Sequence, residues 1–277
     1  MDIATLIGLL LGMGAVLLSA FLDKIDPKIF LSAYTALILV VGGTFGATIL
    51  SFPLQTFLRG FVQGFRTAFF EPHHHEKETI QTLVTFAEKA RREGLLALET
   101  EAAALEDEFM RKGVQLVIDG RDADIIRKIL ETEVSFQQER GSKAETVFMT
   151  MGGFSPTLGI IGTVLGLIEM LGELGAAAAS GNVAGQVGHA TAVAFIATFF
   201  GVLLANLVWL PIAAKVKERN TAALLVREVE IEGILSIQAG DNPRLLEEKL
   251  NAYLPPEQRE SEVEAGGGVA APAAQRG

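Results

Sequence analysis

Residues 147–174 read VFMTMGGFSPTLGIIGTVLGLIEMLGEL, and this run contains no charged side chain before Glu169. A helix that crosses a hydrocarbon core of ~30 Å needs about 20 mostly apolar residues, at a rise of ~1.5 Å each. Three further runs are long enough, residues 3–22, 29–54 and 187–214, and none of them contains Asp, Glu, Lys or Arg. The sequence therefore predicts an all-α, polytopic membrane protein with four transmembrane helices.

The four apolar runs form two pairs separated by a charged insert. We predict two transmembrane helices within 1–54, a helical domain at 55–146, the second pair of helices at 147–214 and a C-terminal segment at 215–277. The N-terminus has no basic residue before its apolar run, and that run is too long for the core of a cleaved signal peptide. We therefore expect the first run to remain as an anchor in membrane lipid.

Composition narrows the possible functions. Hydrophobic residues make up 49% of the chain and its net charge is −10, whereas a nucleic-acid-binding protein needs a basic surface against the phosphates. The chain has no cysteine, so it has no disulfide bonds or thiolate metal sites. His73, His74 and His75 are adjacent, and adjacent side chains rarely converge on one ion, so a polar loop is favoured over a metal site. We predict no metal, no cofactor and no nucleic-acid partner.

Basic residues near the spans predict the orientation, because Lys and Arg are retained on the cytoplasmic side. They follow the second span, precede the third and follow the fourth, whereas the two loops on the other side are short. The insert and both termini are therefore expected in the cytoplasm. Trp209, close to the cytoplasmic end of the fourth span, suits the aromatic belt at the membrane interface. The basic residues are Arg59, Arg66, Arg127, Lys128, Arg140, Lys143, Lys215, Lys217, Arg219 and Arg227.

The insert has the apolar periodicity of a cluster of helices. Residues 77–101, 105–118 and 122–138 each repeat apolar side chains close to every 3.6 residues. Asp119-Gly120 is a turn signal, and Asp122 is a suitable N-cap. The C-terminal segment is expected to be helical at 228–237, to break at 240–243, to resume as far as Leu254 and to be disordered after Pro256.

The third and fourth spans contain glycines and prolines that affect helix packing. Gly159, Gly162 and Gly166 allow another helix to approach closely, and the last two form a GxxxG pair. Pro156 and Pro211 each leave a backbone carbonyl without its usual partner inside the helix. Such backbone is tolerated in a membrane where protein or a water-filled cavity surrounds it, so either proline marks an ion pathway or a simple kink.

Two hydroxyls are expected at the same depth in the third and fourth spans. Thr163 and Thr198 both lie about 16 Å from the outer surface by helical rise, near the middle of the bilayer. A membrane threonine often only bonds the carbonyl four residues before it. Equal depth on neighbouring helices moderately favours a shared polar pathway.

Ion transport normally requires an ionisable side chain inside the membrane. The spans contain none at mid-depth, because Glu169 and Glu173 fall in the last turns of the third span. A conducting role would therefore need a partner helix that brings a carboxylate. The spans also lack paired carboxylates and metal-ligand clusters, so an intramembrane enzyme is the least favoured hypothesis.

The sequence resembles the MotA family of bacterial flagellar stator subunits, which is related more distantly to the ExbB and TolQ energisers. The resemblance extends from Met1 to about Leu254 and rests on five motifs taken together. They are MDIATLIG at 1–8, RREGLLALE at 91–99, the turn at Asp119-Gly120, PTLGIIGT at 156–163 and WLP at 209–211.

This resemblance implies a homo-oligomeric ring of five subunits around two MotB-like chains, which supply the ion-binding aspartate and a peptidoglycan anchor. Ion flow would turn the ring while its cytoplasmic domain pushes on the rotor protein FliG. Arg91 and Glu99 match the charged rotor-facing pair, and Glu133 matches a further charged position. Pro156 and Pro211 match prolines associated with gating and torque. Without the resemblance, the three charged residues would be read as a solvated helix face.

The resemblance favours protons over sodium as the transported ion. Thr163 is similar to the hydroxyl of sodium-driven relatives of the PomA and MotP type, whereas Ala197 stands where those relatives have a second threonine. The rival readings are a sodium-driven stator, an ExbB- or TolQ-like energiser and a non-conducting membrane scaffold. The energisers usually have three spans and an external N-terminus.

Overall fold

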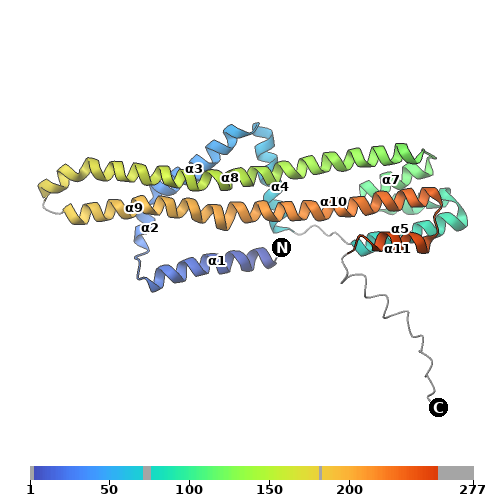
Figure 1. Cartoon of the computed structure of the whole chain (residues 1–277), viewed down its shortest axis with the longest axis horizontal. Helices are drawn as coiled ribbons and strands as arrows, with labels where there is room; N and C mark the ends of the chain where they lie inside the picture. The colour runs from blue at the N-terminus through green and yellow to red at the C-terminus, as the bar shows by residue number, and fades with distance from the viewer. Residues whose placement is uncertain (1–2, 71–75, 181–182, 255–277) are drawn as a thin grey trace, which may run out of the picture. The chain divides into compact units, whose positions relative to one another are not determined.

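The computed structural model describes residues 3–70, 76–180 and 183–254, and within these ranges all the regular structure is helical, with no strand (Figure 1). The chain divides into two compact units. The first, here called the membrane unit, comprises residues 1–72 and 138–220. The second, here called the charged unit, comprises residues 73–137 and 221–277. The predicted His73–His75 loop and the predicted disorder after Pro256 lie outside the described residues.

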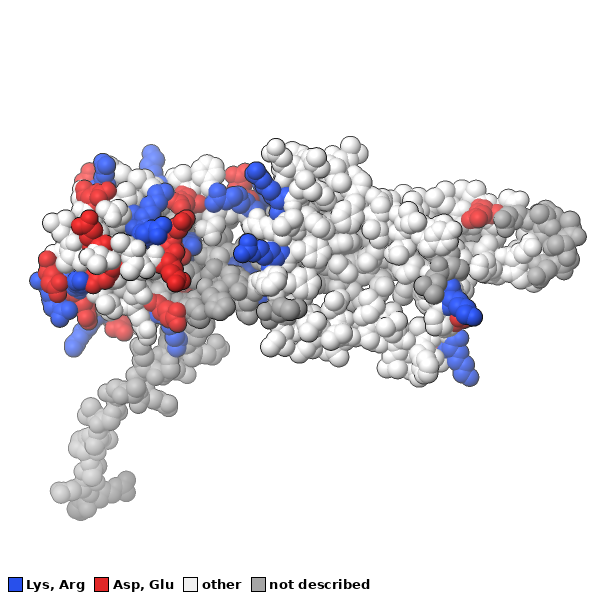
Figure 2. Space-filling view, turned by 180° about the vertical axis from the view of Figure 1, so that it is seen from behind, with Lys and Arg blue, Asp and Glu red and all other residues white. Residues whose placement is uncertain are grey.

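Four helices in the described part of the chain are long and apolar enough to cross a membrane, which agrees with the four predicted spans. They are α1 (Ile3–Leu22), α3 (Tyr34–Ser51), the second part of α8 (Ala123–Ser180) and the helical run that begins with α9 (Val183–Leu204). That run continues through a short π-helical segment (Ala205–Trp209) into α10 (Leu210–Ala239). On the face seen in Figure 2, the membrane unit shows a broad surface without Lys, Arg, Asp or Glu.

The second apolar run is divided into two helices. A short helix, α2 (Lys28–Ser32), is separated from α3 by Ala33, whose φ of −84° and ψ of 28° are not helical. The end of α3 is set by Pro53, because the residue before a proline is driven towards extended backbone, and Phe52 has φ −132° and ψ 151°. The amphipathic helix α4 (Leu54–Phe69) follows.

An aromatic core joins α3, α4, α8 and the π-helical segment. The Phe61 and Phe148 rings stack with centroids 5.6 Å apart, and Phe45 meets Trp209 edge to face at 6.0 Å. Only 6% of Trp209 is exposed, so the prediction of an interfacial belt residue is wrong. Burial against Phe45 and Phe148 makes this indole part of the protein interior.

Close packing of α8 on α9 confirms the predicted role of the glycines in the third span. A Cβ atom at Gly159 would lie 2.9 Å from the Ala197 carbonyl oxygen, and one at Gly162 would lie 2.6 Å from the Ala197 Cβ atom. A Cβ atom at Gly201 on α9 would lie 2.6 Å from the Ser155 carbonyl oxygen. The two backbones therefore approach more closely than any larger residue would allow.

The charged unit contains helices α5 (Glu76–Glu93), α6 (Glu99–Ala104), α7 (Glu108–Ile118) and α11 (Pro243–Asn251), with the beginning of α8 and the end of α10. Their apolar faces enclose a core that includes Leu83, Leu98, Leu130 and Ile234. The prediction of one helix over 77–101 is wrong. Gly94 has a φ of +89°, which ends α5, and a 3₁₀ turn (Leu95–Leu98) leads into α6.

Candidate functional site

The structure brings the two predicted hydroxyls together between α8 and α9. The Oγ1 atoms of Thr163 and Thr198 are 2.5 Å apart. Thr163 Oγ1 also lies 3.0 Å from the Ala194 carbonyl oxygen and 3.2 Å from the Gly159 carbonyl oxygen. Thr198 Oγ1 lies 3.3 Å from the same Gly159 carbonyl oxygen. The group is a small polar contact between helices, and it includes the local bond from Thr163 to the residue four positions earlier.

Each hydroxyl has one proton to donate, so the contact has a limited set of arrangements. When Thr163 donates to the Ala194 or Gly159 carbonyl, its oxygen can accept the proton of Thr198. When Thr198 donates to the Gly159 carbonyl instead, its own oxygen becomes the acceptor. The pair can exchange hydrogen bonds in this way, but both side chains stay neutral.

Ser155 is a polar contact that the sequence analysis missed. Its side chain is fully buried, and its hydroxyl donates to the Gly201 carbonyl oxygen at 2.9 Å. Ser155 lies four residues before Gly159 and thus on the same helix face. A small polar residue in register with the glycine stripe was the signal that could have identified it.

The two prolines have different surroundings. Pro156 lies inside α8, two helical turns before Thr163 and about 10 Å from it along the axis, by a rise of ~1.5 Å per residue. Pro211 follows the π-helical segment and lies about 20 Å along the helix from Thr198 by the same rise. The structure therefore places Pro156 in the region of the hydroxyls and Pro211 away from it.

Three ionisable residues of the third and fourth spans lie elsewhere along their helices. Glu169 is exposed on α8, and the side chain of Glu173 is outside the described part. His189 lies in α9 near its beginning. Within the described residues, no group of three or more His, Cys, Asp or Glu side chains is placed to hold a metal ion.

The predicted rotor-facing residues all lie in the charged unit but on different helices. Arg91 is exposed in the last turn of α5, and Glu99 is exposed at the first residue of α6, so the break at Gly94 separates them. Glu133 on α8 is only partly exposed, and its carboxylate lies 2.5 Å from the Lys112 ammonium on α7. Arg91 and Glu99 are thus presented to solvent, whereas Glu133 also links two helices.

A second charged group in this unit was not identified from the sequence. The Arg227 guanidinium lies 2.7 Å from both Glu230 and Asp107, and Asp107 caps the N-terminus of α7. Burial raises the pKa of Glu230 to about 7, although Arg227 opposes the shift. Burial alone would also raise the pKa of Asp107, but hydrogen bonds from Arg227 and the Met110 N–H hold it below its usual value. Arg227 and Glu230 are three residues apart on α10, but position 107 is too distant in sequence for a local pattern to reveal its contact with Arg227.

The fold and the site define a multi-pass helical membrane protein whose third and fourth spans meet through glycines, Ser155 and a hydroxyl pair. The chain belongs to the MotA/TolQ/ExbB proton channel family, whose model matches residues 101–229. This family and the four apolar helices make it a multi-pass protein of the inner membrane.

Individual relatives match nearly the whole chain. Motility protein A of Borreliella burgdorferi is 36% identical over 260 residues, which cover 94% of this chain and 96% of the relative. The solved structure of C. jejuni MotAB is 27% identical, with a TM-score of 0.84 over 93% of this chain and 97% of that one. The flagellar MotAB stator complex from Bacillus subtilis is 32% identical, with a TM-score of 0.82 over 93% of this chain and 98% of that one.

Proposed function

We propose that the chain is a stator subunit of the bacterial flagellar motor. Together with a MotB-like subunit it forms an ion channel that converts ion-motive force into torque on the rotor. The observation that carries this proposal is the contact of Thr163 with Thr198, a polar contact between two closely packed membrane helices. The similarity to motility protein A and to MotAB structures over more than nine tenths of the chain supports it. The chain acts as a channel and motor component rather than as an enzyme.

The channel is incomplete without its partner. Residues 147–168 and 187–214 contain no Asp, Glu, Lys or Arg, and the two threonines can relay a hydrogen bond but cannot hold a charge. A carboxylate from the MotB-like subunit would accept the ion beside this hydroxyl pair. The two solved relatives are complexes of the MotAB type, which supports such a partner. A ring of five copies would place several hydroxyl pairs around it.

Ion flux into liposomes tests this division of roles. We expect the reconstituted chain alone to pass no selective current and the complex with its MotB-like subunit to conduct. Thr163→Leu, which replaces the hydroxyl with a bulkier apolar side chain, should impair flux through the complex. Selective proton or sodium current through the chain alone would refute the borrowed carboxylate, and unchanged flux in Thr163→Leu would remove the role of the hydroxyl pair.

Protons are the favoured ion. Ala197 is 1% exposed and packs against Gly162, so the helix contact has no room for a second hydroxyl at that position. A short chain of neutral hydroxyls suits proton transfer, whereas a bare metal cation needs several oxygen ligands to replace its hydration shell. Swimming speed of cells that depend on this stator should be insensitive to sodium and should fall with a protonophore. Sodium-dependent swimming that continues in the presence of the protonophore would show that sodium, not the proton, is the coupling ion.

The charged unit and both termini are placed in the cytoplasm in this proposal. Basic residues flank the ends of the spans that lead into the unit, and retention of such residues on the cytoplasmic side gives the orientation. A membrane-impermeant label at Met1 should therefore react only after the cells are opened. Labelling of intact cells would favour the topology of an ExbB- or TolQ-like energiser.

We propose that Arg91 and Glu99 contact the rotor protein FliG, and that Glu133 contributes through its position on α8. Both Arg91 and Glu99 are exposed, and no ion pair between them is present in the described part of the chain. Arg91→Glu or Glu99→Lys should reduce torque while the protein still assembles in the membrane. Loss of membrane assembly in both variants would show that the residues are structural.

The role of Glu133 can be tested independently of Arg91 and Glu99, because Glu133 forms an ion pair with Lys112. If the ion pair is what matters, Glu133→Lys should impair motility and the swap Lys112→Glu with Glu133→Lys should restore it. If Glu133 meets the rotor directly, the swap should remain impaired. A non-conducting scaffold, the remaining alternative, would give motile cells even when the channel complex passes no ions.

A further inference from the structure

The membrane unit contains an apolar cavity of about 540 Å³ among α1, α4, the π-helical segment and the beginning of α10. Its walls are mainly aliphatic and aromatic side chains, including Leu9, Phe65 and Leu207. A cavity of about 300–1,000 Å³ is large enough for a small organic ligand. All the residues that line the cavity belong to the membrane unit, which carries the candidate membrane spans, so lipid chains are available to it.

One end of the cavity is polar. Lys215 of α10 and Thr5 of α1 both line it, and the Lys215 ammonium donates a hydrogen bond to the Thr5 hydroxyl. The Thr5 hydroxyl in turn lies 3.2 Å from the Ala68 carbonyl oxygen. Lys215 is the first charged residue after the uncharged run 187–214, and Thr5 is near the start of the run 3–22. The polar end therefore lies at the membrane interface and the apolar part extends inward from it.

The inward part has room for a chain-like molecule. Leu207 and Lys215 both line the cavity, and they are separated along the helix by about 12 Å, by a rise of ~1.5 Å per residue. Gly8 lines the opposite wall, and a Cβ atom there would meet no heavy atom within 4 Å. An elongated apolar ligand with an anionic head fits this shape and charge.

We propose that the cavity binds an anionic phospholipid, with one acyl chain between α1, α4 and α10 and its phosphate at Lys215. A basic residue at the cytoplasmic membrane surface attracts anionic lipid, and basic sites between transmembrane helices bind such headgroups. The aliphatic part of Lys215 covers the cavity wall while its ammonium remains at the interface. The apolar lining stabilises the acyl chain and the ammonium selects the headgroup.

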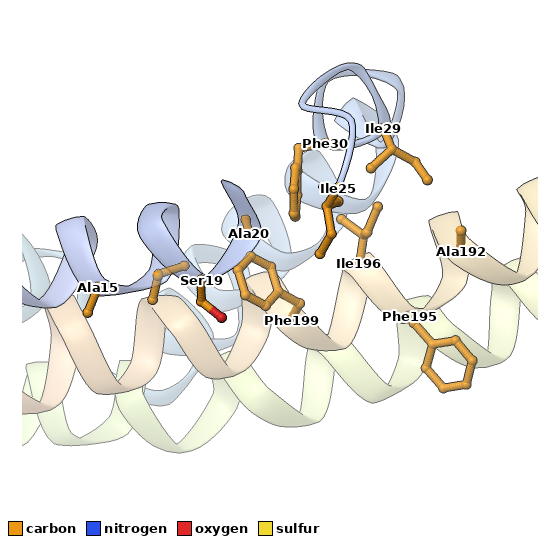
Figure 3. A pocket seen from close by; sticks show the side chains of 11 residues that line it. Ala15, Ser19, Ala20, Ile25, Ile29, Phe30, Ala192, Phe195, Ile196 and Phe199 are labelled. Atoms are coloured by element: carbon orange, nitrogen blue, oxygen red, sulfur yellow. The ribbon is translucent and has the colours of Figure 1, made fainter. Parts of the chain in front are cut away.

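A second cavity in the same unit offers an internal comparison. It has a volume of about 580 Å³ and lies among α1, α2 and α9 (Figure 3). The residues that line it include Phe30, Phe195 and Phe199, and Ser19 is the polar one among those shown. No charged residue lines this cavity, so we expect it to take up acyl chains without headgroup preference.

Trp209 gives a direct readout, because it is the only tryptophan in the chain and adjoins Val208, which lines the first cavity. The full-length chain, in complex with its partner subunit, is reconstituted with dibrominated phosphatidylglycerol or dibrominated phosphatidylcholine. Bromine quenches nearby indole fluorescence, and the signal of a Trp209→Phe complex is subtracted to remove other tryptophans. We expect phosphatidylglycerol to be preferred about fivefold, the factor that one basic residue near the surface provides.

Two variants and two matched controls assign the effect to this cavity. Lys215→Gln should bring the preference for phosphatidylglycerol close to one. Gly8→Leu should fill the cavity and abolish quenching that depends on lipid binding there. Lys217→Gln on α10 and Gly14→Leu on α1 change the same residue types outside the cavity lining and should behave as the unaltered protein.

Equal quenching by both lipids in the unaltered complex would overturn the proposal. So would a preference that survives Lys215→Gln, or quenching that survives Gly8→Leu. An equal loss in the two control variants would assign the effect to general membrane charge or to helix packing, and would refute a specific site.

Discussion

Glu230 gives the charged unit a pH dependence that can be measured. The side chain is 1% exposed on α10, and its carboxylate meets Arg227, which also bonds Asp107 at the N-terminus of α7. Glu78 and Glu106 line the same hollow as these three residues, so the surroundings carry more acidic than basic groups. Burial raises the pKa of Glu230 to about 7 from an ordinary value of 4.5.

The sign follows from proton binding in the two states. Between pH 4.5 and 7 the folded unit holds a proton on Glu230 that the unfolded chain has released, so stability falls as pH rises through this window. A rise in the pKa of this carboxyl from 4.5 to about 7 corresponds to roughly 3 kcal/mol in full. Because titration is incomplete at the limits of the range, the stability lost between pH 5 and pH 8 is on the order of 2 to 3 kcal/mol. Above pH 8 the Glu230 contribution is constant.

Hydrogen exchange of the full-length protein in detergent can measure this change. Peptides from 105–120 and 225–237 report local opening of α7 and α10 after correction for the intrinsic pH dependence of exchange. Between pH 5 and pH 8 the opening free energy should fall by roughly 2 to 3 kcal/mol more in the unaltered protein than in Glu230→Gln, which cannot titrate. The matched control is Glu228→Gln, an exposed position on the same helix.

Two results would refute the reasoning. If Glu230→Gln keeps the full pH dependence, the titrating group is elsewhere in the unit. If the unaltered protein becomes more stable from pH 5 to pH 8 relative to Glu230→Gln, attraction to Arg227 outweighs burial and the pKa of Glu230 is lowered rather than raised.

Three further changes test the packing. Gly201→Leu would place a Cβ atom 2.6 Å from the Ser155 carbonyl oxygen and should destabilise the protein by about 3 kcal/mol or more, seen as a lower melting temperature in detergent. Gly153→Leu is the control, because a Cβ atom there points into open space and should leave the melting temperature unchanged. Ser155→Ala should cost about 1 kcal/mol in the same assay through its lost bond to Gly201, and more than Thr157→Ala, whose bond is exposed. Gly94→Ala should destabilise the turn between α5 and α6 by about 1 kcal/mol, because alanine is strained at a φ of +89°. The expected result is faster proteolysis between α5 and α6, and equal proteolysis rates in the variant and the unaltered protein would show that the backbone relaxes to remove the strain.

The membrane helices could be predicted because each span must by itself be long enough to cross the bilayer. A span must be long and uncharged whatever its neighbours are, so the sequence identified all four. The glycines and the two threonines were also accessible, because they share a depth and a helix face. Ser155 lies on the same face, and was missed because its register with the glycines was not considered in the sequence analysis.

Local patterns failed where a single residue or a distant contact decides the structure. The apolar period of 77–101 continues across Gly94, but the positive φ of that residue ends the helix. Ala33 interrupts the second span without any composition signal. Trp209 was assigned to the interface by its position along the span, whereas its burial depends on Phe45 and Phe148 from other helices. The contact of Asp107 with Arg227 and Glu230 likewise exists only after folding.

The glycine contact and the neutral hydroxyl pair have one physical cause. Since a Cβ atom at Gly159 or Gly201 would meet the facing backbone, α8 and α9 are close enough for Thr163 and Thr198 to bond each other and the Gly159 carbonyl. Those bonds occupy the hydroxyl protons, and the tight contact leaves no space for an additional acid between these two helices. In the proposed channel, an ion would therefore reach the pair from outside this helix contact, on the side of the partner helix. Widening the contact to admit a charge would separate the hydroxyls, so close packing of α8 on α9 supports the proposal that the carboxylate comes from a partner subunit.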